Sequence, residues 1–411
     1  MPHLNRTRAE ALMAAAGLDA LILLSPESFR YATGAEPGVA TMWRRAGAVA
    51  VLVPADARLP ETAVASDLFA PAFRAQSPIA DLRETPIWVE TADLRGADPA
   101  LPAPAAFAAA WAAEGRAQGF ARPTTFDAAA CWRHLAAALA ERGLARGRVG
   151  VEMAAISAAD WPGLAAALPG AELVDGSTVI GRLKMVKGPE EIALLRQAVT
   201  LAETGIAAVR AAIAPGVTRA ALSQAWAAAI AANRGTAPMT GAWDYISVGP
   251  DPWGAGGVVE PGALVKVDVG TVMAGYTSDS GRTFVLGAPT PQQADLFAAL
   301  EAGFAAGLAC LTPGTPLAEV HRATTAAIRA AGFPGFSRGH FGHSLGTGPG
   351  SEDWPFIAAD STEVLEPGMV MAFECPCYVT GLGGMIIEDQ ILVTPQGPAP
   401  MNHLPRGLQA L

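Results

Sequence analysis

The chain has 411 residues, of which 51% are hydrophobic and 16% charged. This is enough apolar material for two domains with packed cores, and it excludes general disorder. The 28 basic and 38 acidic residues give a net charge of −10 without basic runs, which disfavours binding to the phosphate backbone of nucleic acids.

In the first half, apolar runs of strand length alternate with helical patterns, which is typical of an α/β layer. Helices are expected at Arg6–Ala16, Ala105–Ala113 and Ala128–Glu141, and strands at Leu18–Leu24, Ala46–Val53 and Val149–Glu152.

A long helix is predicted from Pro189, because proline suits the first turn and Glu190 and Glu191 suit the positive end of the helix dipole. We place the domain boundary just before it, which gives domains at 1–180 and 181–411. After residue 240 the order is strands, helices and strands again, which predicts an α+β domain. Strands are expected at 263–269, 276–286, 369–374, 384–388 and 390–393, with a turn at Gly270–Gly275, and helices at 291–309 and 317–331.

Acidic residues interrupt or end several of the apolar strands of this second domain. Asp268 lies inside one predicted strand and Asp279 inside the next. Aspartate is depleted in strands and an unpaired buried charge is costly, so each requires a cation or a strong hydrogen-bond partner. The same reasoning applies to His343 in a glycine-flanked segment and to Glu374 and Glu388, each of which ends a predicted strand.

Each of these acids alone fits a strand-end residue or an ion-pair partner, but five candidates together favour a metal centre. Four carboxylates and one imidazole form a suitable ligand set for two divalent ions such as Mn, Co, Fe or Zn. Two adjacent ions can lower the pKa of a water held between them and polarise a carbonyl group.

The motifs resemble those of the pita-bread metallopeptidases. This superfamily includes methionine aminopeptidase, aminopeptidase P, prolidase and the metal-free creatinase. The resemblance lies in the spacing Asp268-x10-Asp279 within VDVGTVMAGYTSDSGRTF, in GHSLG at 342–346, in FEC at 373–375 and in IED at 387–389. In addition, Gly17–Gly34 resembles a creatinase-type N-terminal domain, and Lys184–Arg196 resembles the start of the catalytic domain.

The resemblance implies an α/β creatinase-like N-terminal domain, an α+β pita-bread catalytic domain and a homodimer. Asp268 would chelate one ion, His343 and Glu374 would bind the other, and Asp279 and Glu388 would bridge the two. A metal-bridged hydroxide would attack the carbonyl carbon of a peptide, Xaa-Pro or amide-like C–N bond. Glu374 would pass the proton to the leaving nitrogen.

The chain departs from the family pattern around the substrate. Gly350 stands where a second histidine is usual, Asp251 or Trp253 where another histidine precedes the first aspartate, and Ile386 where arginine is expected. His340 is the best candidate for a replacement hydrogen-bond donor near the carbonyl. Trp253 is a further candidate for substrate binding.

Substrate contact is also predicted for Trp43 and Arg44, because in creatinase-like dimers this segment reaches toward the partner's active site. The expected ligand is a small molecule or short peptide, without nucleic acid or membrane. The scattered cysteines, and an N-terminus without a signal-peptide core, fit a cytoplasmic protein.

Two other functions remain open. The same fold hosts metal-dependent lyases, such as those that split dimethylsulfoniopropionate, and some pita-bread proteins are non-catalytic binding modules. A serine-hydrolase reading of GHSLG is rejected, because Thr347-Gly-Pro-Gly350 cannot start the helix that a nucleophile elbow needs. The pair Cys375 and Cys377 has no second pair nearby and is a weak zinc signal.

Overall fold

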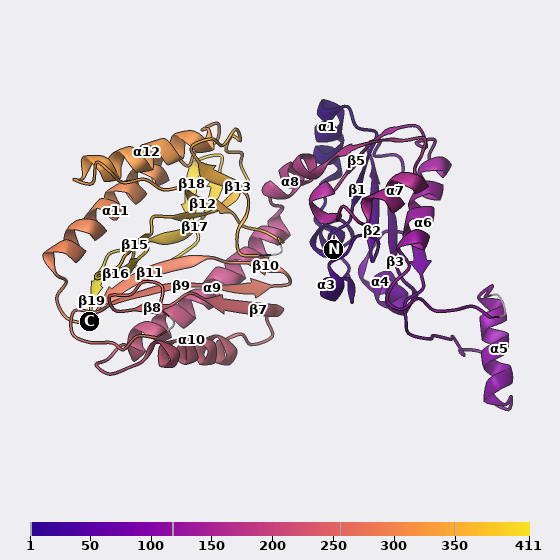
Figure 1. Cartoon of the computed structure of the whole chain (residues 1–411), viewed down its shortest axis with the longest axis horizontal. Coiled ribbons are helices and arrows are strands. Elements are labelled where there is room, and N and C mark those ends of the chain that lie inside the picture. The colour runs from indigo at the N-terminus through magenta and orange to yellow at the C-terminus, as the bar shows by residue number, and fades with distance from the viewer. Residues whose placement is uncertain (1, 117–118, 255, 349) are drawn as a thin grey trace. The chain divides into compact units, whose positions relative to one another are not determined.

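The computed structural model describes residues 2–116, 119–254, 256–348 and 350–411. The chain forms two compact units, which meet in sequence between Leu183 and Lys184 (Figure 1).

The N-terminal unit is built on a six-stranded mixed sheet with the strand order β4-β3-β2-β1-β5-β6. Only the pairs β1–β2 and β2–β3 are antiparallel. The strands are β1 (Ala20–Leu23), β2 (Ala50–Pro54), β3 (Thr62–Ser66), β4 (Asp81–Thr85), β5 (Arg148–Val151) and β6 (Glu172–Asp175). The helices are α1 (Arg6–Ala16), α2 (Pro26–Thr33), α3 (Ala40–Trp43), α4 (Ala70–Gln76), α5 (Ala103–Ala113), α6 (Ala128–Glu141), α7 (Trp161–Ala167) and α8 (Ser177–Met185), whose last two residues belong to the C-terminal unit.

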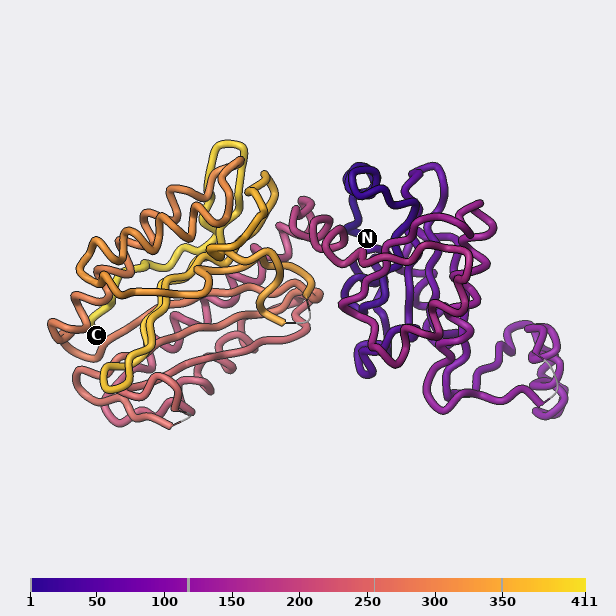
Figure 2. Tube along the Cα trace, turned by 45° about the horizontal axis from the view of Figure 1, so that its top comes forward, coloured from indigo at the N-terminus to yellow at the C-terminus, as the bar shows by residue number. Residues whose placement is uncertain are grey.

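The central strands of this sheet are buried on both faces, which explains their continuous apolar runs. Leu21 and Leu23 of β1 pack in a cluster with α1 and α2. The alternate residues Ala20 and Ile22 pack with α6 on the other face. The segment that carries α5 extends away from the rest of this unit (Figure 2).

The C-terminal unit is built on an eleven-stranded sheet, in which β10-β9-β11-β17-β14-β12-β13 are successive neighbours. Further strands pair at the sides, β7 and β8 with β9, β18 with β17 and β19 with β11. The strands are β7 (Met239–Asp244), β8 (Ser247–Val248), β9 (Leu264–Met273), β10 (Tyr276–Thr277), β11 (Ser280–Val285), β12 (His340–Ser344), β13 (Asp353–Ala358), β14 (Val370–Glu374), β17 (Glu388–Thr394), β18 (Gly397–Pro400) and β19 (Gln409–Ala410), while β15 (Cys377–Val379) and β16 (Gly383–Met385) form a separate hairpin.

Two helix pairs complete this unit. Helices α9 (Pro189–Ala212) and α10 (Arg219–Asn233) share one apolar cluster with β9, and α11 (Pro291–Cys310) and α12 (Leu317–Ala330) share another with β14. By length and composition α9 could cross a membrane, but half of its apolar stretch is buried within the protein, as in the core helix of a globular domain.

Three predictions about the strands are wrong. Gly270 lies within β9 rather than opening a turn. The position requires glycine because a side chain there would collide with the Trp243 ring and with the backbone oxygen of Ser278. Asp279 lies in the link between β10 and β11 instead of inside a strand. Glu388 begins β17 rather than ending the strand before it.

Candidate metal centre

All five predicted metal ligands line one cavity of about 440 Å³ in the C-terminal unit. The strands that carry them are successive neighbours in the sheet, so residues far apart in sequence meet. Asp268 comes from β9, Asp279 from the link before β11, His343 from β12, Glu374 from the end of β14 and Glu388 from the start of β17.

The strand register places like charges beside one another. Glu374 lies directly opposite Glu388, and Asp268 and Glu388 both pair with Gly281, on its two sides. Because carboxylates that face each other across strands destabilise a sheet, this arrangement requires a compensating cation.

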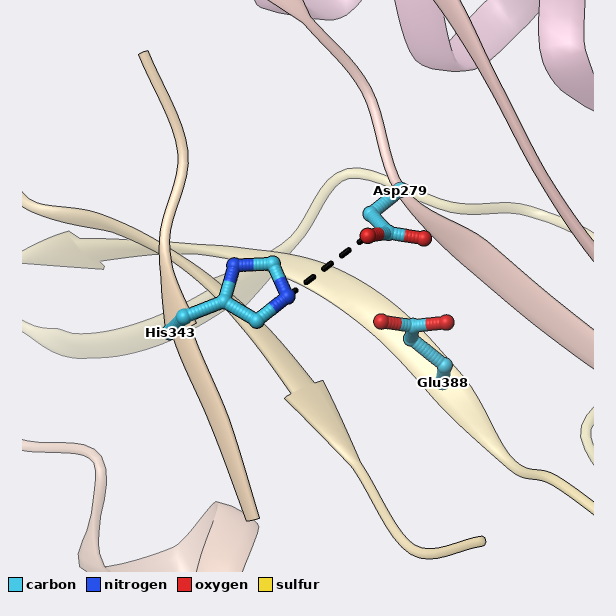
Figure 3. A group of neighbouring side chains, drawn as sticks. All are labelled: Asp279, His343 and Glu388. Carbon is cyan, nitrogen blue, oxygen red and sulfur yellow. Dashed lines mark ion pairs between the residues drawn. The ribbon is translucent and has the colours of Figure 1, made fainter. Parts of the chain in front are cut away.

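Asp279, His343 and Glu388 form the tightest group, hereafter the Asp279–His343–Glu388 cluster. Each offers a ligand atom that lies within 4.8 Å of the others, and Figure 3 shows the three side chains pointing toward one another. His343 Nε2 is 3.5 Å from Asp279 Oδ2. On the other side of the ring, Nδ1 lies 3.0 Å from the Ser344 carbonyl oxygen, the contact that metal-binding histidines commonly make through their second nitrogen.

One oxygen on each carboxylate of this cluster lacks a partner among the described residues. Asp279 Oδ1 and Glu388 Oε2 are buried and have no hydrogen-bond partner among the described residues. Burial first, and then repulsion by neighbouring carboxylates, raises the pKa of both Asp279 and Glu388 well above the ordinary values. Orphaned buried oxygens beside an imidazole fit a divalent cation.

The other two predicted ligands have cationic neighbours that the sequence analysis missed. Lys266 Nζ lies 2.8 Å from Asp268 Oδ2, and Arg338 Nη2 lies 2.8 Å from Glu374 Oε1. Lys266 could have been found, because residues two apart on a strand share a face. Arg338 precedes β12 and carries no comparable signal.

The predicted donor His340 lies beside the centre. Its Nδ1 is 3.6 Å from Glu374 Oε1, and burial lowers the pKa of the imidazole. The ring lines a neighbouring cavity together with Trp354 and Phe356. Its contact with the centre therefore runs through Glu374.

The metal-centre cavity has an aromatic wall. Trp253, a predicted substrate residue, is 72% exposed and stacks on Tyr378 with ring centroids 4.5 Å apart. Trp243 and Tyr245 also line the cavity, and no motif singled them out. Ile386, which stands at the expected arginine position, is fully buried and contributes no polar group.

Trp43 and Arg44 belong to the N-terminal unit and make contacts within it. The Trp43 ring packs on Trp88 and Phe126, with centroids 5.1 and 5.0 Å apart. Arg44 Nη1 donates to Glu27 Oε1 at 2.7 Å. Their contact with substrate stays a prediction.

Comparison with known proteins assigns the class. The pattern described as "Metallopeptidase family M24" matches residues 193–395, and the one described as "Creatinase/Prolidase N-terminal domain" matches residues 6–85. The chain belongs to the pita-bread metallopeptidase superfamily, with a creatinase-type N-terminal domain and an M24 catalytic domain, and it is a metallohydrolase of the prolidase-like kind. The predicted fold class is confirmed.

Individual similar proteins agree with this class. The chain is 29% identical over 266 residues to the uncharacterized peptidase YqhT of Bacillus subtilis, covering 64% of this chain and 74% of that one. It is 28% identical over 322 residues to an Xaa-Pro dipeptidase of Lactobacillus delbrueckii subsp. lactis, covering 76% and 84%. The crystal structure of dipeptidase PepE from Mycobacterium ulcerans superposes with a TM-score of 0.76 at 25% identity, covering 98% of this chain and 96% of that one.

Proposed function

We propose that this chain hydrolyses a peptide bond of short peptides with the help of divalent metal ions, and that Xaa-Pro dipeptides are the first substrates to test. The observation that carries the proposal is the pair of buried oxygens without partners, on Asp279 and Glu388, beside the imidazole of His343. Relatives named as peptidases and dipeptidases support it over a lyase or a binding module.

The ligand set offers positions for two ions from the group Mn, Co, Fe and Zn. Asp279 and Glu388 would bridge them, Asp268 would hold one, and His343 and Glu374 would hold the other. When bound, such ions supply Lewis acidity that polarises the scissile carbonyl and acidifies a water.

Glu374 is the proposed proton carrier. Arg338 holds its Oε1, which leaves Oε2 to take a proton from the attacking water and deliver it to the leaving nitrogen. His340, in contact with Oε1 and 3.9 Å from Glu352 Oε2, is the proposed hydrogen-bond donor at the edge of the cavity, which Glu352 lines.

The cavity suits a small substrate. Its volume of about 440 Å³ lies at the lower end of the range for small-molecule sites, and its aromatic wall can pack against a proline ring or an apolar side chain. We also propose a cytoplasmic homodimer in which Trp43 and Arg44 contact substrate in the partner. Analytical ultracentrifugation tests the dimer, and the KM of Arg44→Ala tests the contact.

The decisive experiment combines metal analysis with a substrate panel. Chelator-treated protein is reloaded with each metal and offered Xaa-Pro dipeptides, other dipeptides, simple amides and dimethylsulfoniopropionate, with products identified by mass spectrometry. We expect metal-dependent cleavage of dipeptides. Hydrolysis that survives removal of the metal, or release of dimethyl sulfide instead of amino acids, would refute the proposal.

A further inference from the structure

The charges at the metal centre are distributed unevenly. Among the described residues, no lysine or arginine forms an ion pair with Asp279 or Glu388, and one oxygen of each has no hydrogen-bond partner, whereas Asp268 is already paired with the ammonium group of Lys266. Asp268 and Glu374 are therefore neutralised by the chain itself, and the carboxylates of the cluster are not.

Lys266 is held firmly in this position. Its side chain is 4% exposed, and Nζ lies 5.2 Å from the centre of the Tyr378 ring, a cation–π distance. The stem passes close to Gly384, where an added Cβ would lie 3.3 Å from Lys266 Cδ and 3.0 Å from Ser247 Oγ. A packed stem and a cation–π contact both favour the inward position of the ammonium group.

The residue type is informative as well. The chain has 28 basic residues, yet only three are lysines, at positions 184, 187 and 266. Lysine presents a compact point charge, while arginine presents a planar fork of donors. A point charge beside one carboxylate oxygen resembles a small metal ion more closely than a guanidinium does.

The overall charge favours one divalent ion. The four carboxylates of the ligand set carry four negative charges, and Lys266 and Arg338 supply two positive charges by direct contact. Among these side chains, one divalent ion completes the neutralisation. Two ions would leave a surplus of two positive charges, which a hydroxide between them would reduce to one, and a surplus charge in a buried site is costly. The other charged residues that line the cavity, Arg219 and Glu352, cancel.

We propose that the Lys266 ammonium group takes the place of one of the two divalent cations, so that a single ion at the Asp279–His343–Glu388 cluster completes the centre. A second ion binds at Asp268 only by displacing Lys266. This inference rests on the proposed function, because it concerns the same metal centre. It keeps the reaction and the five ligand residues, but of the two ion positions that the ligand set offers it leaves only one occupied by a metal.

The test measures how many metal ions each full-length chain binds. Chelator-treated protein is titrated with Co²⁺ and followed by visible absorption and calorimetry, and metal content after equilibrium dialysis is measured by mass spectrometry. We expect wild type to saturate at one ion per chain. Lys266→Met should bind two, with the second ion at least tenfold tighter than in wild type, because Asp268 is released.

Two matched variants separate the charge of Lys266 from general effects of lysine loss. Lys266→Arg keeps the positive charge and should keep one ion, and Lys184→Met removes a lysine that does not line the cavity and should also keep one. Wild type that binds two ions with similar affinity would overturn the inference, as would Lys266→Met that still binds one. The wild-type measurement alone decides the matter if Lys266→Met does not fold.

Failure of the inference differs from failure of the proposed function. Two ions in wild type together with peptide hydrolysis would remove the role of Lys266 and leave the peptidase standing. One ion per chain without hydrolysis of any peptide would support the role of Lys266 and refute the proposed peptidase activity.

Discussion

Glu388 and Asp389 are consecutive residues at the start of β17, each 1% exposed, yet their surroundings are opposite. Asp389 accepts from Arg282 Nη2 at 2.8 Å and from Arg406 Nε at 2.6 Å. Glu388 points to the other face of the strand, where one of its oxygens has no partner among the described residues. Of these two neighbours, the carboxylate that two arginines neutralise is structural, and the one that the chain leaves unneutralised indicates a bound cation.

The largest effect should come from removing a buried carboxylate that the chain leaves unneutralised. We expect Asp279→Asn to lose bound metal and to lower peptide hydrolysis by a factor on the order of 10³, more than the 10- to 100-fold typical for residues that only support metal ligands. Stability of the metal-free protein should be unchanged or higher, because an uncompensated buried charge is removed. Metal content, hydrolysis rate and urea denaturation measure the three quantities on one preparation.

The matched control is Asp295→Asn, an exposed acid on α11, which should leave all three quantities unchanged. If Asp279→Asn retained metal and full activity, the interpretation of the unpartnered carboxylates as metal ligands would be wrong.

Removing Asp389, the neutralised carboxylate, should lower the stability and leave metal binding unchanged. Asp389→Asn removes the nearer carboxylate partner of the buried Arg282 guanidinium and leaves only Glu203, whose Oε1 lies 4.0 Å from Arg282 Nη2. Loss of one member of a buried ion pair costs about 3–5 kcal/mol. We therefore expect a large loss of stability in the metal-free protein, measured by urea denaturation. The number of metal ions bound by the folded fraction should not change. A stability equal to that of wild type would contradict the contrast between Glu388 and Asp389.

This contrast marks the limit of what the sequence could predict. IED at 387–389 shows two adjacent acids. Glu388 was singled out by its place at the end of a predicted strand and by the family resemblance, but that strand prediction is wrong, because both acids lie at the start of β17. The helices α1, α6 and α9 were predictable because their periodicity and end signals are local. The pairing of Asp268 with Lys266 could have been predicted from the alternation of a strand. The pairing of Glu374 with Arg338 could not, because it depends on side-chain placement within the folded sheet and the arginine comes from a segment without any motif.

The wrong predictions about the strands also result from contacts that form only in the folded sheet. Gly270 has the chemistry of a turn residue, but tertiary packing of Trp243 explains its presence inside β9. Local sequence cannot distinguish a glycine that bends the chain from one that makes room for a neighbour.

The comparison between neutralised and unneutralised buried charges also applies to a cation, Lys187. Its Nζ donates to the Ser344 hydroxyl at 2.6 Å and to the Met185 carbonyl at 3.0 Å, both neutral, and burial lowers its pKa to about 8. Between pH 8 and the ordinary lysine pKa of about 10.5, the unfolded chain binds this proton and the folded chain does not. Stability should therefore rise with pH across this window, by roughly 3 kcal/mol in total.

The measurement is the difference between wild type and Lys187→Met in urea denaturation at pH 7, 8, 9 and 10, since other titrating groups cancel in the difference. The wild-type advantage should grow with pH. A difference that stays constant from pH 7 to 10 would show that Lys187 loses its proton at the same pH in both states.

The smallest effect should come from the exposed aromatic wall, where neither burial nor charge is involved. Because Trp253 is 72% exposed, Trp253→Ala should change stability by less than about 0.5 kcal/mol. If the ring stacks on substrate as it stacks on Tyr378, losing about 1 kcal/mol of aromatic contact should raise KM about fivefold and leave kcat unchanged. Trp253→Phe keeps a stacking ring and should restore most of the affinity. An unchanged KM in Trp253→Ala would remove this residue from the substrate site, whereas a lower kcat would place it with the carboxylates that act on the reacting bond.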